Sequence, residues 1–282
     1  LMTFLTSILL GLCMGSGAAV SMQYGSGEEA RMRQSVFQSF VLIAGIALVL
    51  NLLVYLGLDG ILWVLRVPEE LKPLMKDYLL IIFLGITATF LYNYFANLLR
   101  AIGNSVVPLV FLAVSSILNV VLDLWFIAGM GMGVAGAAVA TVIAQGVSVV
   151  LCILYVMARV RILIPGRKHL DVGRKLYWDL FSQSISMGLM SSIVSAGSVI
   201  LQYGINGLGT LTIAGHTAAR KLFAFTDMPL IAMANAASTF VSQNYGAVQP
   251  ERIRKGMREI YLYSLVVMVV TVLLMQVSAE WL

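Results

Sequence analysis

Long apolar segments limit what this chain can fold into more than any other feature of its sequence. Of its 282 residues, 60% are hydrophobic and only 11% are charged, whereas charged residues make up about a quarter of a typical soluble domain. A helix that crosses the hydrocarbon layer needs about 20 consecutive, mostly apolar residues. We therefore expect a membrane protein. The same composition excludes a soluble domain and a disordered chain, and it argues against a nucleic-acid-binding protein.

Eight segments of the chain are long and apolar enough to form such helices. Transmembrane strands are shorter and alternate apolar with polar residues, and the segments found here do neither. The sequence thus predicts an all-α membrane protein, a polytopic helical bundle. The predicted spans cover residues 1–22, 36–58, 77–98, 106–127, 132–157, 180–204, 222–243 and 260–282.

The basic residues between these spans are divided unevenly. Alternate loops hold thirteen of the eighteen lysines and arginines, and the other loops hold five. Because loops rich in lysine and arginine stay on the cytoplasmic side, the first set is predicted to be cytoplasmic, and both ends of the chain lie near the outer face. The thirteen are Arg31, Arg33, Arg100, Arg159, Arg161, Arg167, Lys168, Arg174, Lys175, Arg252, Arg254, Lys255 and Arg258.

The longest predicted cytoplasmic loop, residues 161–179, contains Pro165, Gly166 and a mixed cluster of charges. On composition alone it is either a linker between two bundles or an ordinary loop within one. The internal repeat described next favours a linker between an N-terminal bundle, residues 1–160, and the start of a second bundle, residues 180–282. Since Leu1 and Leu282 both lie inside apolar runs, we expect the chain to be an internal piece of a longer protein.

A short sequence near the N-terminus recurs near the C-terminus. Residues 20–35, VSMQYGSGEEARMRQS, align with residues 241–256, VSQNYGAVQPERIRKG, at a constant offset of 221. Each copy follows an apolar run and leads into a basic loop. Six predicted spans separate the copies, and because six is an even number both copies have the same orientation in the membrane. Parallel repeats of this kind are typical of transporters.

Asp123 is the clearest candidate for a functional residue inside a predicted span, because an ionisable side chain at the bilayer centre costs roughly 2.5 kcal/mol or more. Asn119 lies one helical turn before it on the same face. The glycine-rich loop at residues 129–133 is short, so the next helix should be an antiparallel neighbour. Asn119 and Thr141 each lie eleven residues from Met130, which predicts that their side chains lie at the same depth.

A carboxylate, an amide oxygen and a hydroxyl on facing helices suit Na⁺, and the carboxylate could instead take a proton. We assign Asp123, Asn119 and Thr141 to a cation-coupling site, with Asp123 and Asn119 as metal ligands where the ion is Na⁺. From the sequence alone, a purely structural role for these residues is as well supported as a role in cation coupling. Asp123 could reach interfacial water from a helix end, and Asn119 could hold two helices together.

The sequence lacks the common catalytic motifs. It contains no HExxH, GxSxG or GxxxxGK[ST] sequence, and neither of its two histidines is spaced for a metal site with a carboxylate. We therefore expect no enzymatic activity and no resident cofactor. Without a nucleotide-binding motif, transport by this chain would draw on an ion gradient.

Two stretches of the chain resemble the multidrug and toxic compound extrusion (MATE) family. Residues 100–145 contain RAIGNSVVP, NVVLD and GMGVAGAAVATVIAQ, and residues 205–256 contain INGLG, AGHTAARKLFAFTDMP, STFVSQNYGA and ERIRKG. The resemblance implies two pseudo-symmetric six-helix repeats around a central cavity, both truncated here, with the second to ninth spans present. It also implies a first-bundle cation site at Asn119, Asp123 and Thr141, completed by an aspartate on the first span.

The function implied by the resemblance is secondary export of small amphipathic or cationic organic compounds, by Na⁺ or H⁺ antiport with alternating access between two bundles. We assign Gln202, Asn97 and Met190 to the substrate cavity. Because residues 185–202 contain no acid, no second cation site is assigned. The expected partners are small-molecule substrates and membrane lipids, without nucleic acid, for a monomer that spans a bacterial plasma (inner) membrane several times.

Two other functions stay open. A flippase for lipid-linked glycan precursors has a related fold, and it would need a cavity rich in arginine and lysine to hold a pyrophosphate. A membrane-embedded enzyme or channel would need a paired catalytic group or a continuous pore.

Overall fold

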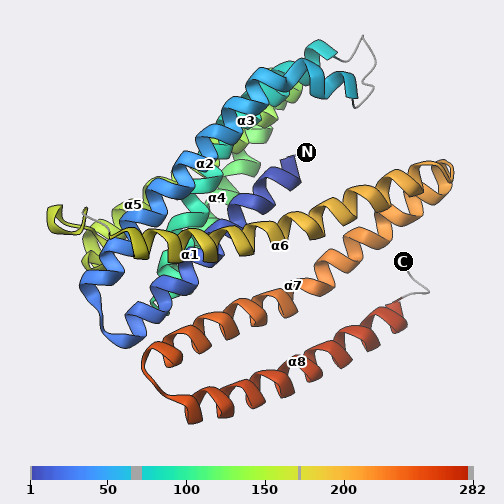
Figure 1. Cartoon of the computed structure of the whole chain (residues 1–282). Helices are drawn as coiled ribbons and strands as arrows, with labels where there is room; N and C mark the ends of the chain where they lie inside the picture. The colour runs from blue at the N-terminus through green and yellow to red at the C-terminus, as the bar shows by residue number, and fades with distance from the viewer. Residues whose placement is uncertain (1, 65–71, 171–172, 279–282) are drawn as a thin grey trace. The chain divides into compact units, whose positions relative to one another are not determined.

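The computed structural model describes residues 2–64, 72–170 and 173–278. Helices make up nearly all of this part of the chain, and it contains no strand. In hydrocarbon each backbone N–H and C=O must find its partner within the segment, and a helix provides this. The main helices (Figure 1) are α1 (Met2–Ser26), α2 (Glu29–Val64), α3 (Lys72–Ala101), α4 (Val106–Asp123), α5 (Gly133–Arg159), α6 (Arg174–Asn206), α7 (Thr210–Gly246) and α8 (Pro250–Ser278).

The prediction of an all-α membrane protein is confirmed. Six of the eight predicted spans coincide with helices that are long and apolar enough to cross a membrane, in α1, α2, α4, α5, α6 and α8. The other two, residues 77–98 and 222–243, lie within the long helices α3 and α7. The predicted positions of Leu1 and Leu282 near the outer face concern residues outside the described part.

The helices form two compact units. Unit 1 consists of α1 up to Val20 and of Glu29–Ser192, and unit 2 consists of Ser21–Glu28 and the chain from Ile193 onward. The predicted linker, residues 161–179, contains two short 3-10 helices, η3 (Arg161–Leu163) and η4 (Arg167–His169), and the first turns of α6. The division of the whole protein into bundles on either side of this linker stays a prediction.

Aromatic residues of α3 lie at the centre of unit 1. Phe83, Phe90 and Tyr94 are each no more than 2% exposed. The ring of Tyr94 meets that of Phe40 on α2 edge to face, with the ring centroids 5.5 Å apart, and its hydroxyl bonds to that of Ser39 at 2.9 Å. Because a buried hydroxyl without a partner is costly, this bond allows a tyrosine to occupy the core.

Glycines bring α1 into backbone contact with α6 inside unit 1. A Cβ atom at Gly11 would lie 2.7 Å from the Cα of Gly188, and one at Gly15 would lie 2.7 Å from the Cα of Ser184. A spacing of four residues puts both glycines on one face of α1. In lipid, helices associate by such close packing rather than by exclusion of apolar surface from water.

The internal repeat takes the form of two copies of one backbone turn. After α1, the N–H groups of Gly27 and Glu28 donate to carbonyls of the last helical turn at 3.2 and 3.1 Å. After α7, Val248 and Gln249, each 221 positions later, make the equivalent bonds at 3.1 and 2.9 Å. Gly27 has φ +74° and Val248 has φ +54°. The backbone geometry therefore supports the offset found in the sequence.

The two copies of the repeat also contact each other within unit 2. A Cβ atom at Gly25 would overlap the carbonyl oxygen of Gln243, and one at Gly246 would overlap that of Met22. Gly25 and Gly246 are equivalent at the offset of 221, and so are Met22 and Gln243. The contact is thus reciprocal, as it would be across a two-fold axis.

Alanine at Gly25 or at Gly246 is expected to destabilise the protein by roughly 1–3 kcal/mol each, because the new methyl group meets backbone atoms that cannot move aside. Thermal unfolding in detergent would measure the loss. Gly204→Ala is the matched control, since no atom of the described residues lies within 4 Å of a Cβ there. Equal melting temperatures for all three variants would contradict this interpretation.

Val248→Gly is expected to stabilise the protein by roughly 0.5–1 kcal/mol, because a left-handed φ is costly for valine and free for glycine, and the greater freedom of unfolded glycine offsets part of the gain. The reverse change at the equivalent position, Gly27→Val, should lower the melting temperature. An unchanged or lower melting temperature for Val248→Gly would show that valine bears no strain.

Candidate functional site

Asn119 of α4 and Thr141 of α5 contact each other, as their equal predicted depth requires. The Nδ2 of Asn119 donates to the Oγ1 of Thr141 at 3.3 Å, and the Oγ1 donates to the backbone oxygen of Ala137 at 2.9 Å. Further along the pair, the hydroxyl of Ser115 donates to the backbone oxygen of Ala144 at 2.7 Å. These bonds fix α4 and α5 as antiparallel neighbours. They also orient Asn119 so that its carbonyl oxygen remains an acceptor.

Asp123, the last residue of α4, is half-buried. Its Oδ1 atom is buried and has no hydrogen-bond partner among the described residues. Buried polar atoms are nearly always paired, and an exception is often explained by a bound ion or water. This oxygen can therefore accept a proton or coordinate a cation.

A π-helix, η2 (Leu124–Gly129), begins immediately after Asp123. Its wider turns bring the N–H of Met130 to the carbonyl of Trp125 at 3.0 Å, five residues back. π-helices are rare, and this one ends the span, since a turn follows at Met130. The carboxylate thus lies where the register of the helix changes, a feature that the sequence analysis missed.

Polar residues of α3 extend this polar surface. Thr89, Asn93 and Asn97 recur at a spacing of four and share one face. The amides of Asn93 and Asn97 each donate to the carbonyl one turn earlier at 2.8 Å. The hydroxyl of Thr89 donates to the Oε1 of Gln145 on α5 at 2.5 Å, and Gln145 lies one turn after Thr141.

Three helices of unit 1 therefore share a series of half-buried polar side chains, which we call the polar row. Sequence analysis singled out four of its members but missed the three that lie between Thr141 and Asn97, although the four-residue spacing on α3 would have revealed two of them. The polar row consists of Asp123, Asn119, Thr141, Gln145, Thr89, Asn93 and Asn97.

A glycine allows α3 and α5 to approach closely enough for this arrangement. A Cβ atom at Gly85 would lie 2.8 Å from a methyl carbon of Val142 and 4.0 Å from the Oε1 of Gln145. Because Gly85 has no side chain to hold α5 away, the short hydroxyl of Thr89 can reach Gln145.

The three residues assigned to the substrate cavity lie in different places. Asn97 belongs to the polar row and faces α1, where a Cβ atom at Gly17 would lie 3.6 Å from its own Cβ. Met190 lies on the part of α6 in unit 1 and is 56% exposed. Gln202 lies on the part of α6 in unit 2. Their joint role in one cavity stays a prediction.

The oxygen atoms of the polar row that could coordinate an ion favour small hard cations. They are carboxylate, amide and hydroxyl oxygens, the ligands that suit Na⁺ or a proton rather than a soft transition metal. Among the described residues, no group of three histidine, cysteine, aspartate or glutamate side chains is placed to hold a metal ion. The site therefore offers one charge supported by neutral dipoles.

Comparison with known sequences identifies relatives over most of the chain. The family model described as MatE matches residues 1–125 and 187–282. The probable multidrug resistance protein YpnP of Bacillus subtilis is 29% identical over 251 residues, which are 88% of this chain and 55% of YpnP. The multidrug export protein MepA of Staphylococcus aureus is 25% identical over 245 residues, 86% of this chain and 54% of MepA. The chain spans about half the length of these curated relatives.

Solved structures show the same fold. A MATE in complex with MaD5 superposes with a TM-score of 0.88 at 20% sequence identity. The match covers 99% of this chain and 63% of the MATE chain. A multidrug resistance MATE family transporter in an outward-facing conformation gives 0.85 at 19% identity, over 97% of this chain and 61% of its own. Because the family model matches well over half of the residues, the chain belongs to the multidrug and toxic compound extrusion (MATE) family.

Proposed function

We propose that the protein is a secondary active exporter of small amphipathic and cationic organic compounds, driven by Na⁺ or H⁺ antiport. The names of YpnP and MepA, a multidrug resistance and a multidrug export protein, support a role in multidrug efflux. The observation that carries the coupling is a buried oxygen of Asp123 that has no hydrogen-bond partner in the described part of the chain. It lies one turn from the hydrogen-bonded pair of Asn119 and Thr141.

In this mechanism the cation binds at the carboxylate of Asp123. The carbonyl oxygen of Asn119 is the second ligand, and Thr141 holds the amide in place by accepting its N–H. An ion that binds one arrangement of the bundle more tightly than the other shifts the equilibrium toward the first. Cargo that prefers the second arrangement is then exchanged for the ion, and this difference in affinity couples the two fluxes.

The charge of the polar row supports export of cations over flipping of lipid-linked glycans. Its seven members comprise one carboxylate and six neutral side chains. A pyrophosphate would be bound by arginine and lysine, whereas an organic cation gains from a carboxylate and amide oxygens. We also propose that the protein acts as a monomer in a bacterial plasma membrane, without a resident cofactor or a nucleic-acid partner.

Asp123→Asn is expected to reduce ion-driven dye efflux to the level of protein-free vesicles, because the amide neither takes a proton nor carries the charge that binds Na⁺. The measurement is efflux of a fluorescent cation from proteoliposomes that contain equal amounts of folded protein. Asp179→Asn, which alters an exposed carboxylate of α6, is the control and should transport normally. Full transport by Asp123→Asn would contradict the proposed coupling site.

Thr141→Val is expected to raise the concentration of the coupling ion at half-maximal efflux by about tenfold, because a residue that orients a metal ligand typically contributes that much or more to affinity. Efflux is measured with an imposed Na⁺ gradient and, separately, with an imposed pH gradient. Thr217→Val, whose hydroxyl bonds only within the exposed face of α7, is the control. Efflux that responds to neither gradient would overturn antiport.

A further inference from the structure

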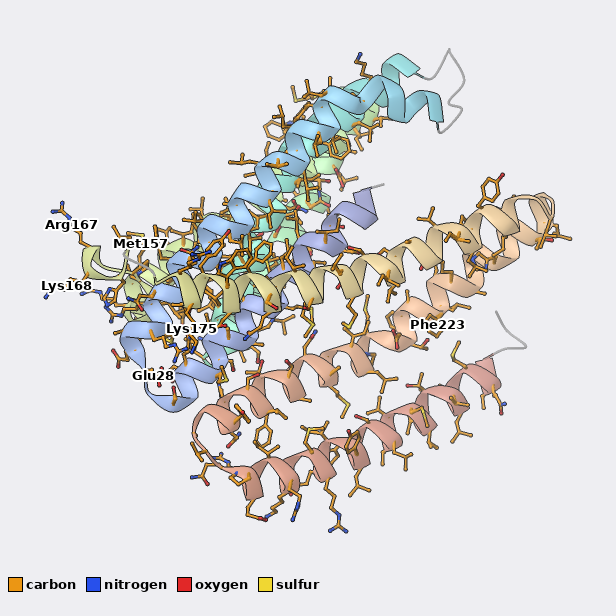
Figure 2. All side chains as sticks on the ribbon, in the orientation of Figure 1. Glu28, Met157, Arg167, Lys168, Lys175 and Phe223 are labelled. Carbon is orange, nitrogen blue, oxygen red and sulfur yellow. The ribbon has the colours of Figure 1, made fainter. Side chains whose placement is uncertain are left out.

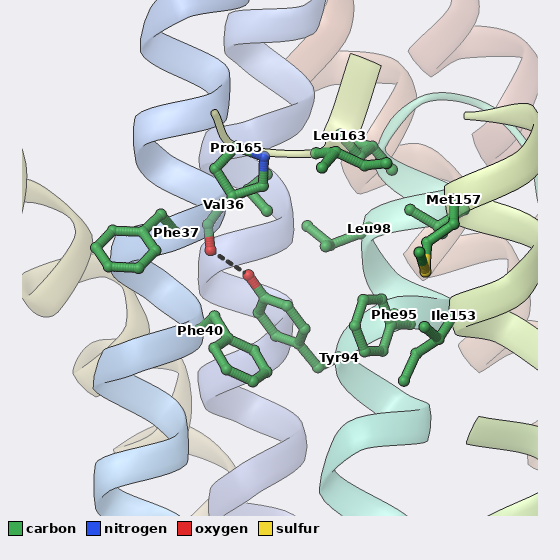
Figure 3. A pocket seen from close by; sticks show the side chains of 12 residues that line it. Val36, Phe37, Phe40, Tyr94, Phe95, Leu98, Ile153, Met157, Leu163 and Pro165 are labelled. Carbon is green, nitrogen blue, oxygen red and sulfur yellow. Dashed lines mark hydrogen bonds between the residues drawn. The ribbon is translucent and has the colours of Figure 1, made fainter. Parts of the chain in front are cut away.

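An apolar cavity of about 230 Å³ opens in unit 1, apart from the polar row. Its floor is α3, with Tyr94 and Phe95, and its sides are α2, with Phe37, and α5, with Ile153 and Met157. Figure 3 shows these side chains arranged around one space. Aromatic and aliphatic carbon atoms therefore form nearly all of its surface.

The segment that follows α5 covers one end of the cavity. Leu163 of η3, only 2% exposed, and Pro165 both line the space, and Figure 3 shows them beside Val36 and Leu98. This cover carries an apolar inner side, while Arg161 and Arg167 on the same segment are exposed. The segment thus presents hydrocarbon to the cavity and positive charge to its surroundings.

The cavity has no polar group available for a polar ligand. Among the described residues that line it, only Tyr94 carries a side-chain hydroxyl, and that hydroxyl donates to the backbone oxygen of Val36 at 2.5 Å and bonds to Ser39. Water needs two or more polar partners to occupy a cavity. A hydrocarbon chain is the ligand that such a surface would hold.

An apolar stripe along α5 leads to the cavity. Val150, Leu154 and Met157 recur at spacings of four and three, which places them on one face, and they are 54%, 56% and 58% exposed. Met157 both ends this stripe and lines the cavity. A chain lying along α5 could therefore enter the cavity without crossing polar surface.

Positive charge surrounds the covered end. Arg159, Arg161, Arg167 and Lys168 are all exposed, and residues 159–170 contain no acidic residue. Figure 2 shows Arg167 and Lys168 pointing away from the helices at this end of unit 1. Clusters of basic residues beside a membrane span attract anionic lipid headgroups by about 1 kcal/mol for each charge.

We propose that this cavity and its basic cover bind an anionic phospholipid, with an acyl chain between α2 and α5 over α3 and the phosphate at Arg159 and Arg161. Neither part alone selects this ligand, because the cavity would accept any hydrocarbon and the arginines any anion. An apolar slot that ends at a cationic rim matches a molecule with an acyl chain joined to a phosphate. The site is independent of the cation site at Asp123.

Native mass spectrometry of the purified protein in neutral detergent, with added phosphatidylglycerol or phosphatidylcholine, tests the headgroup. The wild-type protein should retain phosphatidylglycerol in preference to phosphatidylcholine. The double variant Arg159→Gln/Arg161→Gln should weaken that retention by about fivefold for each arginine removed and leave phosphatidylcholine unaffected. Both residues are exposed, so the fold should persist.

The matched control for charge is Arg252→Gln/Arg254→Gln, which removes two exposed arginines from the first turns of α8. If this pair lowers retention as much as the α5 pair does, the attraction is general and the proposal is overturned. Inorganic phosphate that displaces phosphatidylglycerol at equal concentration would also overturn it, because the acyl chain would then contribute nothing.

The apolar half of the site is tested by Ile153→Trp, whose indole would fill the cavity. Retention of phosphatidylglycerol should fall at least as far as in the double arginine variant. Ile143→Trp, on the same helix but outside the cavity and 41% exposed, should retain lipid normally. Undiminished retention by Ile153→Trp, or a wild-type protein that retains no lipid because another segment occupies the cavity, would overturn the proposal.

Discussion

In a bilayer, burying apolar side chains between helices gains no hydrophobic free energy, because the lipid tails around them are equally apolar. Helices therefore associate where their backbones can approach closely. This constraint explains where the helices of this protein touch. Gly11 and Gly15 bring α1 onto α6, and Gly85 brings α3 onto α5. The reciprocal contact of Gly25 and Gly246 applies the same rule to the two copies of the repeat.

The polar row depends on that packing. Thr89 reaches Gln145 only because Gly85 lets α3 and α5 lie close together. The neutral groups of the row form hydrogen bonds with one another or with backbone carbonyls, whereas Asp123 at its end has an oxygen without a hydrogen-bond partner among the described residues. A half-buried carboxylate beside neutral oxygen ligands is the arrangement on which the proposed cation site rests.

Simple geometry predicted part of this site from the sequence. Counting from Met130 predicted that Asn119 and Thr141 lie at the same depth, and in the structure they form a hydrogen bond. The offset of 221 predicted a repeat, and its two turns have equivalent backbone hydrogen bonds. Gln145 was missed because it is a single polar residue in an apolar run, and its meaning depends on which helix lies opposite. Thr89 and Asn93 were missed although their spacing of four with Asn97 places all three on one face of α3. The left-handed φ of Val248 was unpredictable since valine disfavours it. The π-helix itself consists of apolar and aromatic residues, LWFIAG, and so gives no register signal.

The π-helix has a mechanical consequence for the carboxylate beside it. A π-helical turn contains one residue more than an α-helical turn. Moving this wide turn one position toward the N-terminus would exchange hydrogen bonds without breaking the helix. Since each residue of an α-helix accounts for about 100° of rotation, Asp123 would swing by roughly that angle about the axis of α4. A shift of the wide turn by one position would thus change the direction in which the Asp123 side chain points without moving the axis of α4.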